Sequence, residues 1–107
     1  LYIDSKYRKI EISEEGLTYA AYGKKRSMRW EDMVATNMTW EIEGGHAASY
    51  NWRFFSVDKK EINIPLGYYS RSNMQLLANQ VCSRAKNASI SHSVFAIAGG
   101  KFPWFLF

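Results

Sequence analysis

The chain is poor in the residues that build covalent, metal or redox sites. Its 107 residues include one cysteine, two histidines and two prolines. The single cysteine, Cys82, excludes an intrachain disulfide, and its place in a helical pattern favours a small buried hydrophobe over a nucleophile. His46 and His92 stand alone, without a second ligand at metal-binding spacing. We therefore predict no metal, no cofactor and no catalytic site, and we expect a protein that is not an enzyme.

Long apolar runs are also absent. The most apolar stretch, residues 94–107, is interrupted by Lys101, Gly99, Gly100 and Pro103, and it is too short to cross a bilayer as a helix. The first nine residues are polar and charged, unlike a signal peptide. These features predict a soluble, cytoplasmic protein, with the inner face of the membrane as the alternative location.

The remaining composition is that of an ordered domain rich in aromatic side chains. The length fits one domain spanning residues 1–107, and 47% hydrophobic residues are enough for one core. Aromatic residues make up 16% of the chain and concentrate in strand-like runs, which is typical of a core rather than of a base-stacking platform. A net charge of +4 favours anionic partners only mildly, so nucleic acid is not expected as a partner.

Alternating apolar residues predict a β-rich fold. Residues 7–13, 17–22 and 26–30 alternate and are separated by polar turns at 14–16 and 23–25, which favours an antiparallel meander. After a bend at 30–32, further strands are expected from the even-numbered apolar positions of 34–42, from the aromatic run 50–57 and from 62–66. A glycine-rich loop at 44–47 separates the first two of these. Within 50–57 the alternation slips, which either a β-bulge or burial of both faces would explain.

One amphipathic helix is predicted over residues 72–86. Ser72 and Gln75 have capping-box spacing, so Ser72 is the expected N-cap. The apolar positions form a single stripe that should dock on the sheet, and they are Met74, Leu77, Ala78, Val81, Cys82 and Ala85.

Two short strings resemble the bacterial pleckstrin-homology-like domains. They are Arg29-Trp30-Glu31-Asp32-Met33, between the predicted third and fourth strands, and Ile62-Asn63-Ile64-Pro65, before the helix. The resemblance covers about residues 7–87. It implies a mainly β fold, a bent antiparallel barrel or sandwich capped by one C-terminal helix. A lipocalin-like barrel is less favoured because it would need more strands.

A basic cluster is the first candidate contact site. Lys24, Lys25, Arg26 and Arg29 are expected around a turn between strands, where they could meet a phospholipid headgroup or form a solvated hairpin. Eukaryotic members of the wider family bind phosphoinositides around the first hairpin loop. With residues 13–16 as that loop, Glu14 and Glu15 argue against such binding.

The second candidate contact site is the apolar segment 94–107, which the resemblance does not cover. Its exposed aromatic candidates are Phe95, Phe102, Trp104, Phe105 and Phe107. The segment could fold back as an extra strand over a free edge, pack into a second copy or enter a membrane interface. Packing against protein, within the chain or between chains, is favoured over membrane insertion.

Together these features favour a non-catalytic binding or scaffolding module that acts through protein–protein contacts, with a partner protein or self-association expected. A free strand edge is a further candidate surface. The alternative is a membrane-surface module that binds anionic lipid through the basic cluster and the tail aromatics. No small-molecule substrate is expected.

Overall fold

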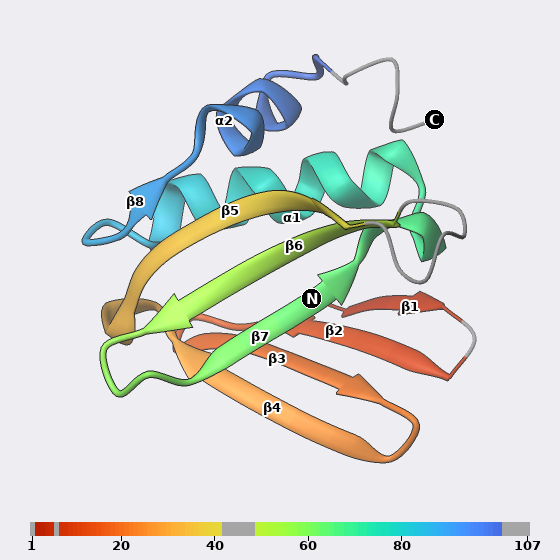
Figure 1. Ribbon diagram of the computed structural model, residues 1–107, viewed down its shortest axis with the longest axis horizontal. Coiled ribbons are helices and arrows are strands. Elements are labelled where there is room, and N and C mark those ends of the chain that lie inside the picture. The colour runs from red at the N-terminus through yellow and green to blue at the C-terminus, as the bar shows by residue number, and fades with distance from the viewer. Residues whose placement is uncertain (1, 6, 42–48, 102–107) are drawn as a thin grey trace.

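The computed structural model describes residues 2–5, 7–41 and 49–101, which form two four-stranded sheets and a layer of helices (Figure 1). The first sheet has the order β1-β2-β3-β4, and the second has the order β7-β6-β5-β8. The prediction of a mainly β fold with a helical cap is confirmed, but the described residues form two α-helices rather than one. The strands are β1 (Tyr2–Ser5), β2 (Arg8–Ile12), β3 (Gly16–Ala21), β4 (Lys24–Arg29), β5 (Met33–Glu41), β6 (Ser49–Ser56), β7 (Glu61–Pro65) and β8 (Ser89–Ile90). The helices are η1 (Trp30–Asp32), η2 (Leu66–Tyr68), α1 (Arg71–Arg84) and α2 (His92–Ala98).

The first sheet is an antiparallel meander, and the alternation of apolar and polar residues predicted for β2 and β3 is confirmed. Ile10, Ile12 and Leu17 are buried on the inner face, as predicted. Strand β1 was not predicted, because Ile3 is the one buried residue among those of β1 whose burial is described, and Tyr2 and Asp4 beside it are exposed. It pairs antiparallel with β2, so the meander has four strands instead of three.

Backbone geometry places the turn between β3 and β4 one residue earlier than predicted. Tyr22 and Gly23 have φ values of 51° and 81°, and two consecutive positive values between paired strands are typical of a type I′ turn. Lys24 and Lys25 therefore belong to β4 and not to the turn. At the other end of β3, a Cβ on Gly16 would lie 2.2 Å from the Met28 carbonyl oxygen, so close strand contact requires glycine there.

A register shift between Met33 and Ala35 explains why the even-position prediction fails at the start of β5. This β-bulge turns Met33 into the core and leaves Val34 exposed. On the paired strand β6, Trp52 is fully buried, and its indole N–H donates to Thr36 Oγ1 at 2.7 Å. The predicted loop 44–47 lies outside the described residues.

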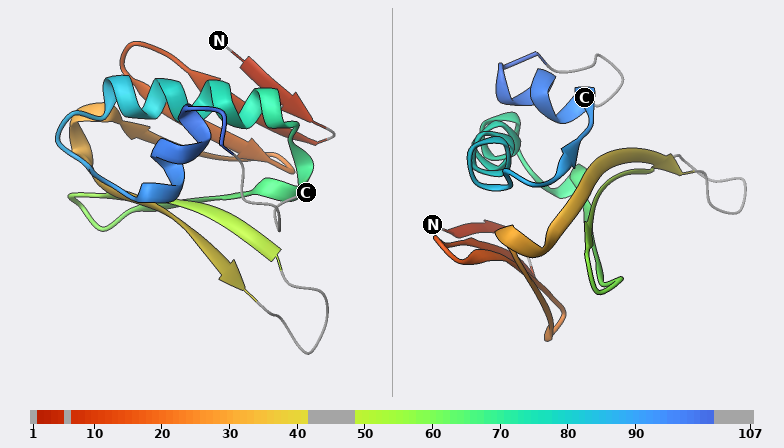
Figure 2. Two further views of the ribbon diagram at one scale, coloured as in Figure 1. Left: turned by 90° about the horizontal axis from the view of Figure 1, so that it is seen from above. Right: turned by 90° about the vertical axis from the view of Figure 1, so that its left-hand side faces the viewer.

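The N-cap of helix α1 lies two residues before the predicted one. Ser70 caps the helix, since its Oγ accepts from the Asn73 N–H at 3.2 Å, so the assignment of Ser72 as N-cap is wrong. The predicted apolar stripe is confirmed except at Cys82, which is only partly buried, and burial raises the pKa of its thiol. Met74, Leu77, Ala78, Val81 and Ala85 are all buried. The helix covers the opening between the two sheets on one side (Figure 2).

The chain after α1 returns to the core, which the sequence did not reveal. Strand β8 pairs in parallel with β5, and α2 packs on α1. Val94 and Ile97 are fully buried, whereas Phe95 between them is 52% exposed. Within the apolar segment 94–107, Val94 and Ile97 therefore pack inside the chain, and Phe95 is the aromatic candidate that the described residues leave exposed. The remaining aromatic candidates, Phe102, Trp104, Phe105 and Phe107, lie outside the described residues.

Candidate binding surface

The predicted basic cluster is divided between two faces of β4. Lys24 and Arg26 stand opposite Ala21 and Tyr19 of β3, so they share the inner face of the sheet. Lys25 and Arg29 alternate with them on the outer face, where Arg29 forms an ion pair with Glu31. The four side chains therefore do not form the single cluster on a turn that the sequence suggested.

The outer edge of β4 is unpaired among the described residues. In the type I′ turn, the N–H of Lys24 points toward Ala21 of β3. Backbone groups alternate in direction along a strand, so those of Lys25, Ser27 and Arg29 point away from β3. All three of these residues are exposed. β4 thus presents a row of backbone donors and acceptors to the surroundings.

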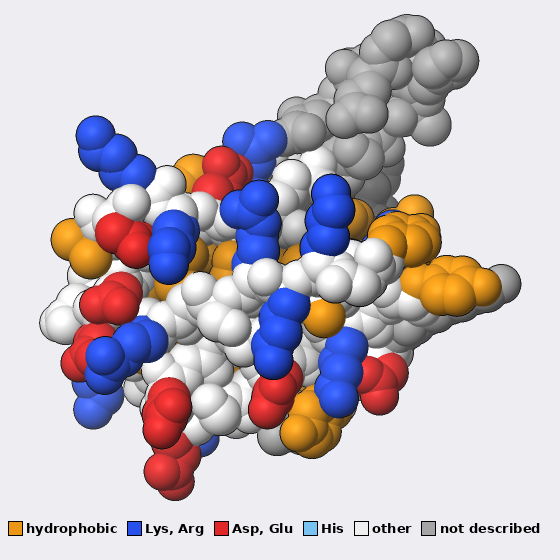
Figure 3. Space-filling view, turned by 90° about the horizontal axis from the view of Figure 1, so that it is seen from below, with side chains coloured by type: hydrophobic (Ala, Val, Ile, Leu, Met, Phe, Trp, Pro, Cys, Tyr) orange, Lys and Arg blue, Asp and Glu red, His pale blue; other side chains and the backbone are white. Residues whose placement is uncertain are grey.

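A hollow of about 650 Å³ lies beside the inner face of β4. Its lining includes Lys24 and Arg26 from β4, together with Arg53 from β6 and Glu61 from β7. Arg26 Nη1 donates to the Glu61 carbonyl oxygen at 3.3 Å, and Arg53 Nη1 lies 3.6 Å from Glu61 Oε1. Seen from this side of the molecule, Lys and Arg side chains form a broken row, while acidic side chains gather mostly toward one end (Figure 3). Sequence reasoning missed Arg53, because it belongs to an aromatic strand far from the basic cluster.

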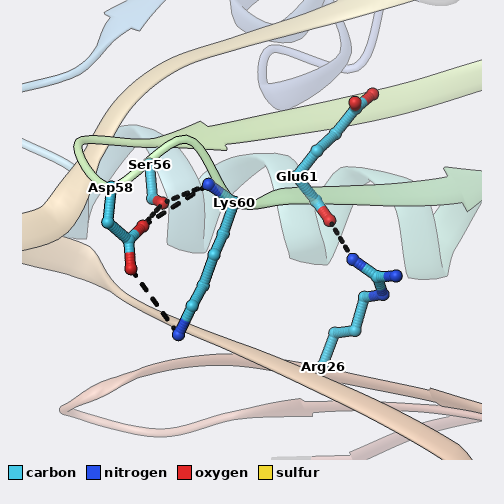
Figure 4. A network of polar contacts seen from close by, with 5 residues as sticks. All are labelled: Arg26, Ser56, Asp58, Lys60 and Glu61. Carbon is cyan, nitrogen blue, oxygen red and sulfur yellow. Dashed lines mark hydrogen bonds and ion pairs between the residues drawn. The ribbon is translucent and has the colours of Figure 1, made fainter.

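A second, smaller hollow of about 300 Å³ lies nearer the acidic end and contains a local polar network. The Ser56 hydroxyl donates to the Asp58 carboxylate, and the Lys60 N–H donates to Ser56 Oγ at 3.1 Å (Figure 4). Lys60 Nζ lies 3.6 Å from Asp58 Oδ2. The hydrogen bond from Ser56, helped by the Lys60 amide and ammonium, holds the pKa of Asp58 below its ordinary value. These contacts satisfy one another and order the β6–β7 turn.

Exposed tyrosines surround Arg8 at the end of the molecule where β2 begins. The Arg8 guanidinium carbon lies 3.7 Å from the Tyr68 ring centroid and 4.9 Å from that of Tyr22. Tyr7 stacks on Tyr22, with ring centroids 5.8 Å apart. Tyr7, Tyr22 and Tyr68 are each more than half exposed. We call these three tyrosines and Arg8 the tyrosine–arginine end.

This end also corrects the location of the first hairpin. The first hairpin joins β1 to β2, just before Arg8 and Lys9, and not β2 to β3. The prediction that residues 13–16 form the first hairpin loop is therefore wrong, and Glu14 and Glu15 do not count against phosphoinositide binding at the first hairpin.

The basic residues of β4 do not lie together with Phe95, the tail aromatic that falls within the described residues. β4 carries the basic residues on one side of the molecule, and α2, which carries Phe95, lies on the opposite side (Figure 1). One flat membrane could not meet both. Among the described helices, none is long and apolar enough to cross a membrane. Within residues 2–5, 7–41 and 49–101, no three His, Cys, Asp or Glu side chains gather as metal ligands.

Comparison of the chain with known protein families, curated proteins and solved structures finds no match. The site must therefore be interpreted from its own geometry.

Proposed function

We propose that this protein is a non-catalytic binding module with a pleckstrin-homology-like fold, and that it recruits an extended segment of a partner protein by strand addition to β4. The observation that carries the proposal is the unpaired six-residue edge of β4, where the backbone groups of Lys25, Ser27 and Arg29 point outward. An extended peptide can bind such an edge through main-chain hydrogen bonds.

The order of the elements supports the family part of the proposal. Four antiparallel strands, three further antiparallel strands and a helix over one opening follow one another along the chain. The string Ile62–Pro65 ends β7 before α1, as the resemblance implies. The string Arg29–Met33 joins β4 to β5 rather than a third strand to a fourth, because β1 shifts the count by one. β8 and α2 extend beyond the region of resemblance.

Replacing Lys25 with proline or alanine tests strand addition. Both changes remove the charge, but only proline removes the outward N–H, and proline is tolerated on an edge strand. Peptides selected from a displayed random library should bind the wild type and Lys25→Ala similarly, and Lys25→Pro about tenfold more weakly. Calorimetry measures the affinities, and hydrogen exchange should show that the peptide protects the Lys25 and Ser27 amides.

Equal affinity for Lys25→Pro without amide protection would contradict strand addition, as would failure to select any peptide. If Lys25→Pro does not fold, the pair Ser27→Pro and Ser27→Ala makes the same comparison at the next outward amide.

The tyrosine–arginine end favours a second candidate function, which is binding to an anionic membrane surface. Tyrosine rings suit the headgroup region, and Arg8 and the nearby Lys24 could meet lipid phosphates. Vesicles of phosphatidylcholine with phosphatidylserine should then sediment the protein, less so as salt rises. Lys24→Glu and Tyr68→Ser should abolish sedimentation, whereas Lys59→Glu at the opposite end should not. No sedimentation at low salt would exclude this candidate.

A further inference from the structure

On the basis of the proposed strand addition, we infer that the partner segment is acidic on one face. It carries carboxylates at alternating positions, and these enter the hollow beside Lys24, Arg26 and Arg53.

The hollow has the charge needed to hold carboxylates. It contains these three basic side chains and one acidic side chain, Glu61. The Glu61 carboxylate already faces Arg53 at 3.6 Å, and Arg26 donates only to the neutral Glu61 carbonyl at 3.3 Å. A carboxylate is a stronger acceptor for guanidinium than a neutral carbonyl. An incoming acidic side chain can therefore replace the Glu61 carbonyl as the acceptor for Arg26, and the lost hydrogen bond is a weak one.

The pleat of β4 determines where the acidic residues must lie in the partner segment. A strand added to β4 places every second side chain on the inner face, next to Lys24 and Arg26. Opposite charges in such cross-strand positions are stabilising. The outer face of β4 requires fewer acidic side chains from the partner segment, because Arg29 is already paired with Glu31. Only Lys25 remains there as an exposed basic neighbour. The expected pattern is thus acid, any residue, acid.

The same charges disfavour a second copy of this chain as the occupant. An antiparallel pairing of two β4 strands would bring two strands with four basic residues each side by side, and in the register centred on Lys25 it would place Lys25 opposite Lys25 and Lys24 opposite Arg26. Like charges directly opposite in a sheet are destabilising, and basic residues on an edge strand prevent such self-pairing. A foreign acidic strand meets no such repulsion.

Three synthetic peptides of equal length test the pattern. One alternates glutamate with valine and threonine, one has the same composition with its glutamates in a block, and one replaces the alternating glutamates with glutamine. The alternating acidic peptide should bind about tenfold more tightly than the other two, measured by NMR titration. It should also protect the Lys25 and Ser27 amides from exchange.

Charge reversal on the two faces of β4 provides the matched control. Lys24→Glu and Arg26→Glu on the inner face should each weaken the alternating peptide about tenfold, while Lys25→Glu on the outer face should weaken it only about threefold. Equal losses on both faces would indicate diffuse attraction and overturn the inference. Thermal melts of all three variants check that each is folded.

The remaining outcomes separate this inference from the proposed function. If the glutamine peptide binds as tightly and protects the same amides, strand addition stands and the acidic preference is wrong. If the acidic peptide binds without protecting those amides, both strand addition and the alternating acidic pattern are wrong. Self-association of the protein alone that Lys25→Pro abolishes would make a second copy the occupant. Binding to anionic vesicles but to none of the peptides would favour the membrane candidate. Both self-association of this kind and vesicle binding without peptide binding would overturn the inference.

Discussion

The edge strand β4 of the first sheet and the strand β5 of the second differ in what covers their outer sides. On its free side β5 pairs with β8, the Ser91 N–H donates to the Thr36 carbonyl at 3.1 Å, and α2 then packs over α1. β4 has no partner among the described residues, and four of its six residues are basic. The β5 edge is covered by β8 at Ala35 and Thr36, whereas the β4 edge is unpaired among the described residues and largely basic.

The difference teaches what each edge can do. Pairing and burial remove the β5 edge from solution at Ala35 and Thr36, because opening it there would expose Val94 and Ile97. Charge prevents unspecific pairing of β4 but leaves its hydrogen-bonding groups available to a strand of opposite charge. The same feature that prevents aggregation can therefore select a partner.

The largest effect is expected where α1 closes the sandwich. Leu77 is 2% exposed. Leu77→Asp loses about 1.5–3 kcal/mol of apolar burial and adds a buried charge that costs several more, a sum comparable with the stability of a small domain. We expect loss of the cooperative thermal transition in calorimetry. The control Asn79→Asp, on the exposed face of α1, should melt like the wild type. A Leu77→Asp variant that also melts like the wild type would mean that α1 is not part of the core.

The next largest effect tests whether α2 belongs to the covered edge. Ile97 is fully buried, so Ile97→Ala should reduce the free energy of unfolding by about 2–5 kcal/mol. Phe95 is 52% exposed, and Phe95→Ala should change it by about 0.5 kcal/mol or less. Urea denaturation measures both. Equal effects of the two changes would mean that α2 does not pack as described.

A smaller effect on the free energy of unfolding is expected at the open edge of β4. Arg26 is exposed and makes one long hydrogen bond to the Glu61 carbonyl. Arg26→Ala should therefore cost about 1 kcal/mol or less in urea denaturation. A loss as large as that of Ile97→Ala would show that β4 is held closed on β7, contrary to an open edge.

The smallest effect concerns pH and the β6–β7 turn. The pKa of Asp58 is lower in the folded chain than in the unfolded one, mainly because the Ser56 hydroxyl donates to its carboxylate. Its contribution to stability is therefore present at neutral pH and is lost as pH falls through the depressed pKa. Asp58→Asn should lower the melting temperature slightly at neutral pH, and the difference should vanish in acid. A difference that grows in acid would have the wrong sign for this network.

Sequence periodicity predicted the parts of the fold whose pattern depends on local burial. The stripe of α1 and the alternation of Ile62, Ile64 and Leu66 are confirmed, since each element has one face in the core. β1 and α2 were not predicted, because only one or two of the described side chains in each are buried. Strand pairing and helix docking define these elements, and periodicity does not. The β-bulge at Met33 depends on register with β6, which no local pattern contains.

The candidate site was predicted only in part, for a similar reason. The basic residues of β4 were identified, but the turn at Tyr22 and Gly23 decides which face each one occupies. Arg53 joins them only through the arrangement of the two sheets. The tyrosine–arginine end likewise combines residues from β2, η2 and the β3–β4 turn, which are distant in sequence.

Amide hydrogen exchange of the protein alone, followed by NMR, tests the open edge of β4 most directly. The account predicts that the amides of Lys25 and Ser27 exchange nearly as fast as in an unfolded chain, whereas that of Arg26, which points toward β3, is protected. Protection of Lys25 and Ser27 as strong as that of Arg26 would mean that the edge is already covered, and it would contradict the account.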